Sequence, residues 1–243
     1  TLAGQIFDHP QYGFLNADVI AVNDDSAREV FLKRGISPQR VVVTGMAHYD
    51  ETWKMAQSLR RSRKTGGLEL VVFATENLPL AETFRMISPF VDATLAIPRA
   101  KMVIRPHPRE NPSIYKDFVR KFGSDRIAVN STTPLLELLS TADVCVTGFS
   151  NVAVEAMMLD RPVICVNLSG EPDKLAYVQE GAALGVYEAS EASSALDKAL
   201  HDHELRAALD KGRRTFLERH FCGADGNASL RIVKLLEKLA ERR

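Results

Sequence analysis

The stretch of residues 143–167, DVCVTGFSNVAVEAMMLDRPVICVN, decides the fold of this chain. Residues 143–147 form a short apolar run of β-forming side chains, which predicts a strand. Residues 148–150 predict a tight turn, and the apolar surface of residues 151–159 predicts a helix. Arg161 and Pro162 end that helix, and residues 163–166 begin the next strand. The order strand, turn, helix, strand is typical of a parallel βαβ unit.

Such a unit places the start of a helix at the carboxyl end of a strand. Backbone N–H groups at a helix start carry partial positive charge and favour an anion such as phosphate. Gly148, Ser150 and Asn151 are therefore candidate phosphate-binding residues, and Ser150 is also a candidate N-cap. Glu155 lies far enough along the helix to accept hydrogen bonds from a ribose diol. A purely structural unit with a capping serine explains the same pattern, and both interpretations stay open.

Strands and helices alternate from residue 68 onward. Further strands are predicted at residues 68–74, 101–104 and 126–129, and further helices at 80–96, 113–122 and 134–140. Three helices near residues 191–200, 203–220 and 226–241 follow the last predicted strand. This alternation predicts an α/β fold: a Rossmann-like, doubly wound parallel sheet with helices on both faces and additional C-terminal helices.

Residues 1–66 are predicted to be the tail end of a preceding Rossmann-like domain plus a linker. Two short strands at 18–22 and 40–44 flank a helix at 27–34, which is too few strands for an independent sheet. A helix at 51–63 leads to the basic, glycine-containing segment 64–67, the best candidate domain boundary. The chain begins with Thr1 rather than Met, and we expect it to be a piece of a longer protein.

Polar side chains follow two other predicted strands. Thr75 and Glu76 come after residues 68–74, where a hydroxyl and a carboxylate could bind a phosphate or the edge of a base. Arg105, His107 and Arg109 come after residues 101–104, in the segment RPHPRE. Its prolines stiffen the loop, guanidinium groups match phosphate oxygens, and histidine can donate to a phosphate or carry a proton. In parallel sheets, ligands bind across these carboxyl ends.

Composition narrows the classes of function. The 243 residues carry 31 basic and 31 acidic side chains, and this balance argues against general nucleic-acid binding. Three cysteines, an odd number without metal-ligand spacing, predict reduced thiols and a cytoplasmic protein. No apolar run is long enough to span a membrane. The Walker, Gly-x-Gly-x-x-Gly and Gly-x-Ser-x-Gly motifs are missing, which disfavours P-loop hydrolysis, dinucleotide redox chemistry and serine hydrolysis.

The chain resembles the C-terminal, donor-binding half of GT-B-fold enzymes that use nucleotide-activated donors. Bacterial capsule and teichoic-acid transferases of the CDP-glycerol glycerophosphotransferase kind are the most similar group. Their His-Pro and Ser motifs hold the donor phosphates and match His107-Pro108 and Ser150. Their ribose-binding glutamate matches Glu155. The resemblance covers most of the chain, although the acceptor-binding N-terminal domain is nearly absent.

The resemblance implies a metal-independent glycosyltransferase or glycerophosphotransferase of surface polysaccharide biosynthesis, in which residues 67–243 bind the donor. His107 would be catalytic, the donor a nucleoside mono- or diphosphate derivative, and the acceptor a carbohydrate or polyol phosphate. No cofactor is implied, although Mg²⁺ bound to a diphosphate stays open, as does peripheral contact with the inner face of the membrane. The fragment alone is not expected to turn over.

Two alternatives remain at this point. The first is a UDP-N-acetylglucosamine 2-epimerase on the same scaffold, although those enzymes have a Gly-Gly-rich turn where this chain has Gly148-Phe149-Ser150-Asn151. The second is a non-catalytic interaction domain that uses its sheet edge or its amphipathic C-terminal helix. The leading segment adds three candidate general bases, His9, His48 and Asp50.

Overall fold

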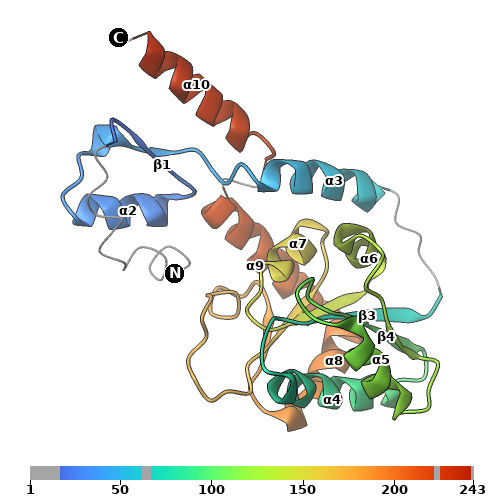
Figure 1. Cartoon of the computed structure of the whole chain (residues 1–243). Helices are drawn as coiled ribbons and strands as arrows, with labels where there is room; N and C mark the ends of the chain where they lie inside the picture. The colour runs from blue at the N-terminus through green and yellow to red at the C-terminus, as the bar shows by residue number, and fades with distance from the viewer. Residues whose placement is uncertain (1–16, 62–66, 222–224, 242–243) are drawn as a thin grey trace.

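Six parallel strands form the central sheet of the computed structural model, which describes residues 17–61, 67–221 and 225–241 (Figure 1). The strands are β3 (Glu69–Ala74), β4 (Ala100–Arg105), β5 (Ile127–Val129), β6 (Val144–Thr147), β7 (Val163–Val166) and β8 (Leu184–Val186). Their order is β5-β4-β3-β6-β7-β8. Because the chain fills one side of β3 first and then the other, the direction of winding reverses between β3 and β6. Ligands of such sheets bind at this reversal.

Helices cover both faces of this sheet. On β3, Val71 and Phe73 belong to a core shared with α4 (Leu80–Ala96), α5 (Pro112–Arg120) and α8 (Ala192–His201). The alternate residues Leu70 and Val72 belong to a second core shared with α3 (Tyr49–Arg61), α6 (Leu135–Thr141), α7 (Val152–Met158) and α9 (His203–Phe221). This alternation along one strand confirms the predicted doubly wound α/β fold.

Two of the cysteines lie in the core of the sheet. Cys145 on β6 and Cys165 on β7 are free thiols with almost no exposed surface. Burial raises the pKa of Cys145 to about 12, because the thiolate would lose its hydration. These two residues therefore act as small apolar side chains. Cys222 lies outside the described residues.

A small unit precedes the sheet and stands apart from it in Figure 1. Strands β1 (Ile20–Val22) and β2 (Val41–Val43) pair in parallel, joined by α2 (Asp25–Lys33) and the 3₁₀ turn η2 (Pro38–Arg40). Asp24 caps α2, since its carboxylate accepts from the N–H of Ala27 at 2.7 Å. The sequence predicted this unit with slightly longer strands. Two strands bury few side chains, so the unit depends on contacts with its neighbours.

Helix α9 connects this leading unit to the six-stranded sheet. His220 of α9 has a side chain only 4% exposed. One ring nitrogen lies 3.4 Å from Asp24 and the other 2.8 Å from Glu180, in the loop between β7 and β8. The same loop approaches α9 so closely that a Cβ on Gly212 would lie 1.9 Å from the carbonyl oxygen of Gly181. A single helix thus holds both the leading unit and the β7–β8 loop.

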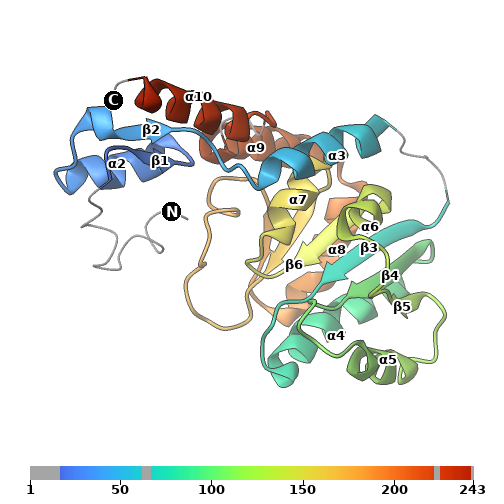
Figure 2. The ribbon, with the colours of Figure 1, turned by 45° about the horizontal axis from the view of Figure 1, so that its top comes forward.

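Helix α10 (Ala228–Ala240) crosses back toward the leading unit, next to β2 in Figure 2. Asp50 of α3 caps it, accepting from the N–H groups of Ala228 at 3.0 Å and Ser229 at 2.7 Å. These bonds outweigh the burial of Asp50, which acts in the opposite direction, and lower its pKa. Asp50 is 6% exposed, and its carboxylate is occupied by the cap. This occupied cap disfavours the interpretation of Asp50 as a general base.

The other two candidate bases have different outcomes. His9 lies outside the described residues. His48 is exposed, and its ring centroid lies 4.1 Å from that of the buried Tyr49. No described helix is long and apolar enough to cross a membrane.

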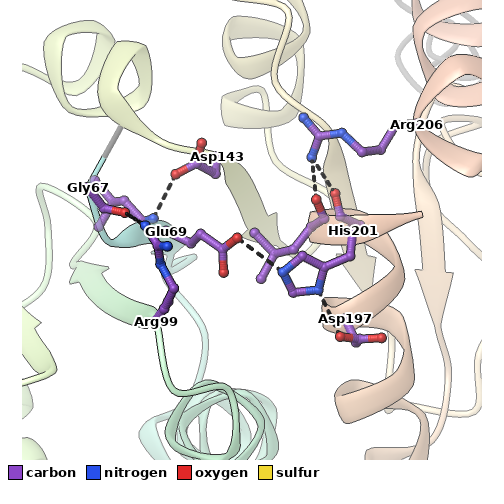
Figure 3. A network of polar contacts seen from close by, with 10 residues as sticks. Gly67, Glu69, Arg99, Asp143, Asp197, His201 and Arg206 are labelled. Atoms are coloured by element: carbon purple, nitrogen blue, oxygen red, sulfur yellow. Dashed lines mark hydrogen bonds and ion pairs between the residues drawn. The ribbon is translucent and has the colours of Figure 1, made fainter. Parts of the chain in front are cut away.

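A polar network fastens the amino ends of the strands, at the edge opposite the candidate site (Figure 3). Asp143 accepts from the N–H of Leu70 at 2.8 Å. Glu69 at the start of β3 lies 3.1 Å from Nε2 of His201, whose Nδ1 lies 2.8 Å from Asp197. The hydrogen bond to Asp197 is the largest cause that raises the pKa of His201, and Glu69 adds to it. This network joins the end of α8 to the sheet.

Two details of the predicted fold were wrong. The sequence pattern predicts no strand after β7, yet Leu184-Gly185-Val186 forms the sixth strand β8. The helix after β6 begins at Val152 rather than at residue 151, so that Asn151 rather than Ser150 occupies the N-cap position. Part of the predicted linker, residues 62–66, lies outside the described residues.

Candidate functional site

The loop after β4 is held in place by Glu110. One carboxylate oxygen, Oε2, accepts from the backbone N–H of His107 at 2.8 Å and from the hydroxyl of Thr75. The other oxygen, Oε1, accepts from the hydroxyl of Tyr115 at 2.7 Å. Tyr115 itself is fully buried on α5. Glu110 therefore joins β3, the β4 exit and α5, and so fixes the backbone that carries His107.

The histidine ring in this loop has a defined orientation. The N–H of Arg109 donates to Nδ1 of His107 at 3.2 Å. Because Nδ1 accepts this bond, the neutral ring carries its proton on Nε2. The side chain is half-buried, whereas Arg109 is exposed. The loop thus presents an Nε2–H donor, which is the correct form for a hydrogen bond to a phosphate oxygen.

Arg105 ends β4 and connects it with the next loop. Its Nη1 donates to the carbonyl oxygen of Asn130 at 3.2 Å. Asn130 in turn accepts from the N–H groups of Thr132 and Thr133 at 3.2 and 3.0 Å, so it organises the β5 exit. Arg105 is half-buried, and the remaining donors of its planar guanidinium can serve a ligand.

In the turn after β6 the first N–H groups of α7 already have hydrogen-bond partners. The hydroxyl of Ser150 accepts from the N–H of Val152 at 3.3 Å, and its carbonyl from Ala153 at 3.1 Å. The N–H groups of Val154 and Glu155 both donate to the carbonyl of Asn151. Because the N–H groups of residues 152–155 already donate to Ser150 and Asn151, an anion would contact the turn at residues 148–151 instead.

Glu155 lies in the first turn of α7 with its carboxyl group turned inward. It is half-buried, and its Oε2 atom is buried without a hydrogen-bond partner among the described residues. Burial raises the pKa of this carboxyl. Burial of its hydroxyl is the main cause that raises the pKa of Tyr49, and the charge of Glu155 adds to this rise. An unsatisfied carboxyl oxygen at this place is free to accept from a hydroxyl group.

Thr75 and Glu76 at the β3 exit differ in what they can offer. Thr75 is a buried residue, only 4% exposed. Its hydroxyl donates to Glu110 and accepts from the N–H of His107 at 2.9 Å. Both of its hydrogen-bonding capacities are used to support the loop. The carboxyl group of Glu76 lies directly over Gly148, where a Cβ would be only 2.8 Å from its Oε1. Glu76 therefore faces the β6 exit rather than the His107 loop.

The β4 loop and the β6 turn leave the sheet at the same edge. Ala74, the last residue of β3, pairs with Arg105, and the hydroxyl of Thr147 donates to the carbonyl of Ala74 at 3.0 Å. The exits of β4 and β6 thus flank β3 at one level, roughly 10 Å apart, as two strand spacings require. Figure 2 shows these three strands side by side. The predicted binding residues thus lie along one edge of the sheet, in two groups: Thr75 bonded to the His107 loop, and Glu76 over Gly148 at the β6 exit.

Sequence reasoning missed Glu110 and Asn130. Both organise strand exits through hydrogen bonds to neighbouring backbone N–H groups. Glu110 stands within the quoted RPHPRE segment, three residues after His107, and a carboxylate at that spacing can reach back to a backbone N–H. Within the described part of the chain, no three His, Cys, Asp or Glu side chains are grouped as metal ligands would be.

This fold, with its converging strand exits, defines the class: a GT-B nucleotide-sugar transferase-like protein. The chain belongs to the family described as CDP-Glycerol:Poly(glycerophosphate) glycerophosphotransferase, which matches residues 94–238. No curated protein shows a significant sequence match to this chain.

Solved structures similar to this chain include members of two groups. A Listeria monocytogenes protein assigned as a UDP-N-acetylglucosamine 2-epimerase is 17% identical, with a TM-score of 0.69 over 93% of this chain and 60% of its own. The UDP-GlcNAc 2-epimerase of Neisseria meningitidis, bound to UDP-GlcNAc, is 15% identical, with a TM-score of 0.67 over 91% of this chain and 62% of its own. The wall teichoic acid polymerase TagF is 15% identical, with a TM-score of 0.55 over 93% of this chain and 58% of its own. At these identities the likeness concerns the fold, and the chain spans about 60% of the length of these proteins.

Proposed function

We propose that residues 67–243 bind the nucleotide-activated donor of a glycerophosphotransferase that acts in surface polysaccharide synthesis. The observation that carries the proposal is the His107 loop: a backbone fixed by Glu110 and a ring whose proton is directed to Nε2. This loop lies at the same sheet edge as the turn at residues 148–151. The family to which the chain belongs favours a CDP-linked polyol as the donor.

In this proposal His107 donates its Nε2 proton toward the leaving phosphate. Charge develops on that phosphate as the bond to the transferred group breaks, and a fixed donor stabilises the charge without reorganising. Arg105 and Arg109 add positive charge next to the same oxygen atoms. Ser150 and Asn151 with Gly148 would contact the second phosphate, and the buried carboxyl of Glu155 the ribose diol.

We further propose that residues 1–66 are the tail end of an N-terminal, acceptor-binding domain plus a linker. The separate two-stranded sheet β1–β2 supports this division. The division is also supported by coverage, because the chain spans only about 60% of the length of the similar proteins described above. The acceptor, a carbohydrate or polyol phosphate, would then bind largely outside residues 67–243. A cytoplasmic location and peripheral contact with the membrane stay predictions.

Calorimetric titration of the chain with CDP-glycerol, CDP, CMP and UDP tests the donor assignment. We expect CDP compounds to bind and His107→Ala to weaken them about tenfold, the equivalent of one hydrogen bond to a charged group. His203→Ala, at an exposed histidine at the start of α9, is the matched control. The proposal fails if CDP does not bind at millimolar concentration, or if both variants behave alike.

The epimerase alternative has the same scaffold in its favour, because two of the similar structures carry that name. Incubation of the longest available form of the protein with UDP-N-acetylglucosamine, followed by separation of the two epimers, distinguishes the reactions. Formation of the epimer without transfer from CDP-glycerol would favour the alternative.

A further inference from the structure

A cavity of about 150 Å³ opens at the point where the winding of the sheet reverses. Its walls come from the exits of three strands and include Glu76, Leu78, Gly148, Phe149, Asn167 and Lys174. The residues proposed to bind phosphate, Arg105, His107, Arg109 and Ser150, are not part of its lining. The cavity therefore lies beside the proposed phosphate site, on the other side of β3 from the His107 loop, and shares only Gly148 with that site.

The β7 exit, which forms one wall of this cavity, is held in place by its own hydrogen bonds. Asn167 donates to the carbonyl of Glu171 at 2.8 Å and to Asp173 at 3.0 Å. Its side-chain oxygen accepts from the hydroxyl of Ser169 at 2.6 Å. Arg85 of α4 donates across to the carbonyl of Leu168 at 3.0 Å, which joins α4 to the β7 exit. Such a preformed site binds a small ligand without a large ordering cost.

Glu76, in the wall formed by the β3 exit, has an unsatisfied oxygen atom. Its Oε1 atom is buried and has no hydrogen-bond partner in the described part of the chain. Burial raises the pKa of the carboxyl, nearby Lys174 opposes this rise, and Glu82 adds to it. A buried polar atom without a partner is costly, and native structures keep such atoms mainly where a ligand or water completes the bond.

The chemistry of this carboxyl selects hydroxyl groups rather than phosphate. Ionised Glu76 would repel a phosphate, so its predicted role as a phosphate ligand is unfavourable at this place. A neutral or ionised carboxyl accepts from hydroxyl groups, and the neutral form also donates to them. Gly148 makes this position available, because any side chain there would collide with the carboxyl at 2.8–2.9 Å.

We propose that the cavity is the subsite for the hydroxyl-bearing group that the donor carries beyond its phosphates, and that Glu76 determines its specificity. This inference rests on the proposed donor function and adds to it the residue that recognises the transferred group. A small polyol is the class of ligand that fits a compact cavity whose wall includes a buried carboxyl oxygen without a partner in the described part of the chain.

Calorimetry with CDP-glycerol and CDP as probes tests the inference, because the two share both phosphates and differ by the glycerol that esterifies the terminal phosphate oxygen. The wild-type chain is expected to bind CDP-glycerol about tenfold more tightly than CDP, the contribution of one or two hydrogen bonds. Glu76→Ala should abolish this preference and leave CDP affinity unchanged, whereas Glu76→Gln should retain most of it. Gly148→Ala, which displaces the carboxyl, should reduce the preference with Glu76 still present.

Glu137→Gln, at an exposed carboxylate on α6, is the matched control and should keep the wild-type preference. Near-ultraviolet circular dichroism shows whether each variant is folded, and Glu76→Gln, the most conservative change, keeps the test decisive if Glu76→Ala is not. The inference is overturned if the wild type binds both probes equally, or if Glu76→Ala retains the preference. Failure of CDP itself to bind would overturn the proposed function, and this inference with it.

Discussion

Replacing Glu110 by alanine should separate the His107 loop from the sheet. The carboxylate accepts three hydrogen bonds, from His107, Thr75 and Tyr115. A hydrogen bond to a charged group contributes about 1.5–3 kcal/mol, and partial access of water to the half-buried Glu110 favours the lower end. Because bonds that share one carboxylate are not additive, the three together contribute less than three times that value. We expect a loss of about 3 kcal/mol in the free energy of unfolding, or roughly 6–12 °C in Tm for a chain of this size.

The same change should also affect binding. A loop without Glu110 no longer holds Nε2 of His107 in one place, so CDP affinity should fall at least as far as in His107→Ala. Glu110→Gln keeps one carbonyl acceptor and should be intermediate in both measurements. Thermal unfolding followed by circular dichroism and calorimetric titration with CDP give the two values. If Glu110→Ala unfolds at the wild-type temperature and binds CDP normally, the loop is fixed by something else, and the reasoning is wrong.

Two further predictions concern α9. The carboxylates of Asp24 and Glu180 outweigh burial and raise the pKa of His220, so its stabilising effect is complete below its ordinary pKa and is lost as the pH rises through the raised value. His220→Gln should therefore cost about 3 kcal/mol near pH 6 and less near pH 9, and urea unfolding that shows an equal cost at both would contradict this. Gly212→Ala should destabilise by about 3 kcal/mol because its methyl group meets the carbonyl of Gly181, although alanine normally stabilises a helix by about 1 kcal/mol. A rise in Tm for this variant would show that the two backbones separate easily.

The sheet could be predicted from the sequence because its signals are local. Continuous apolar strands such as residues 69–74, followed by amphipathic helices, leave little freedom in a parallel α/β arrangement. Strand β8 was missed because it has three residues with Gly185 in the middle, a composition that resembles a loop. Only pairing with β7 makes it a strand.

The candidate site could be predicted in its position but not in its internal bonds. Strand exits identify the edge of the sheet, and this placed His107 and Ser150 correctly on one side. Thr75 was predicted to bind a ligand, but its hydroxyl donates to Glu110 instead. Glu110 lies 35 positions away in the sequence, so this contact could not be predicted from residues near Thr75. Likewise, nothing local to Glu76 shows that its carboxyl lies over Gly148. Contacts of this kind depend on the register between strands, which periodicity does not encode.

Helix α9 gives the chain a mechanical connection between its two ends. It contacts Asp24 in the leading unit through the same imidazole that contacts Glu180, and it presses against Gly181. A swing of the leading unit would therefore pull on the loop that also forms one wall of the cavity beside Glu76. Movement of the leading unit and the shape of this cavity would then be coupled through one helix.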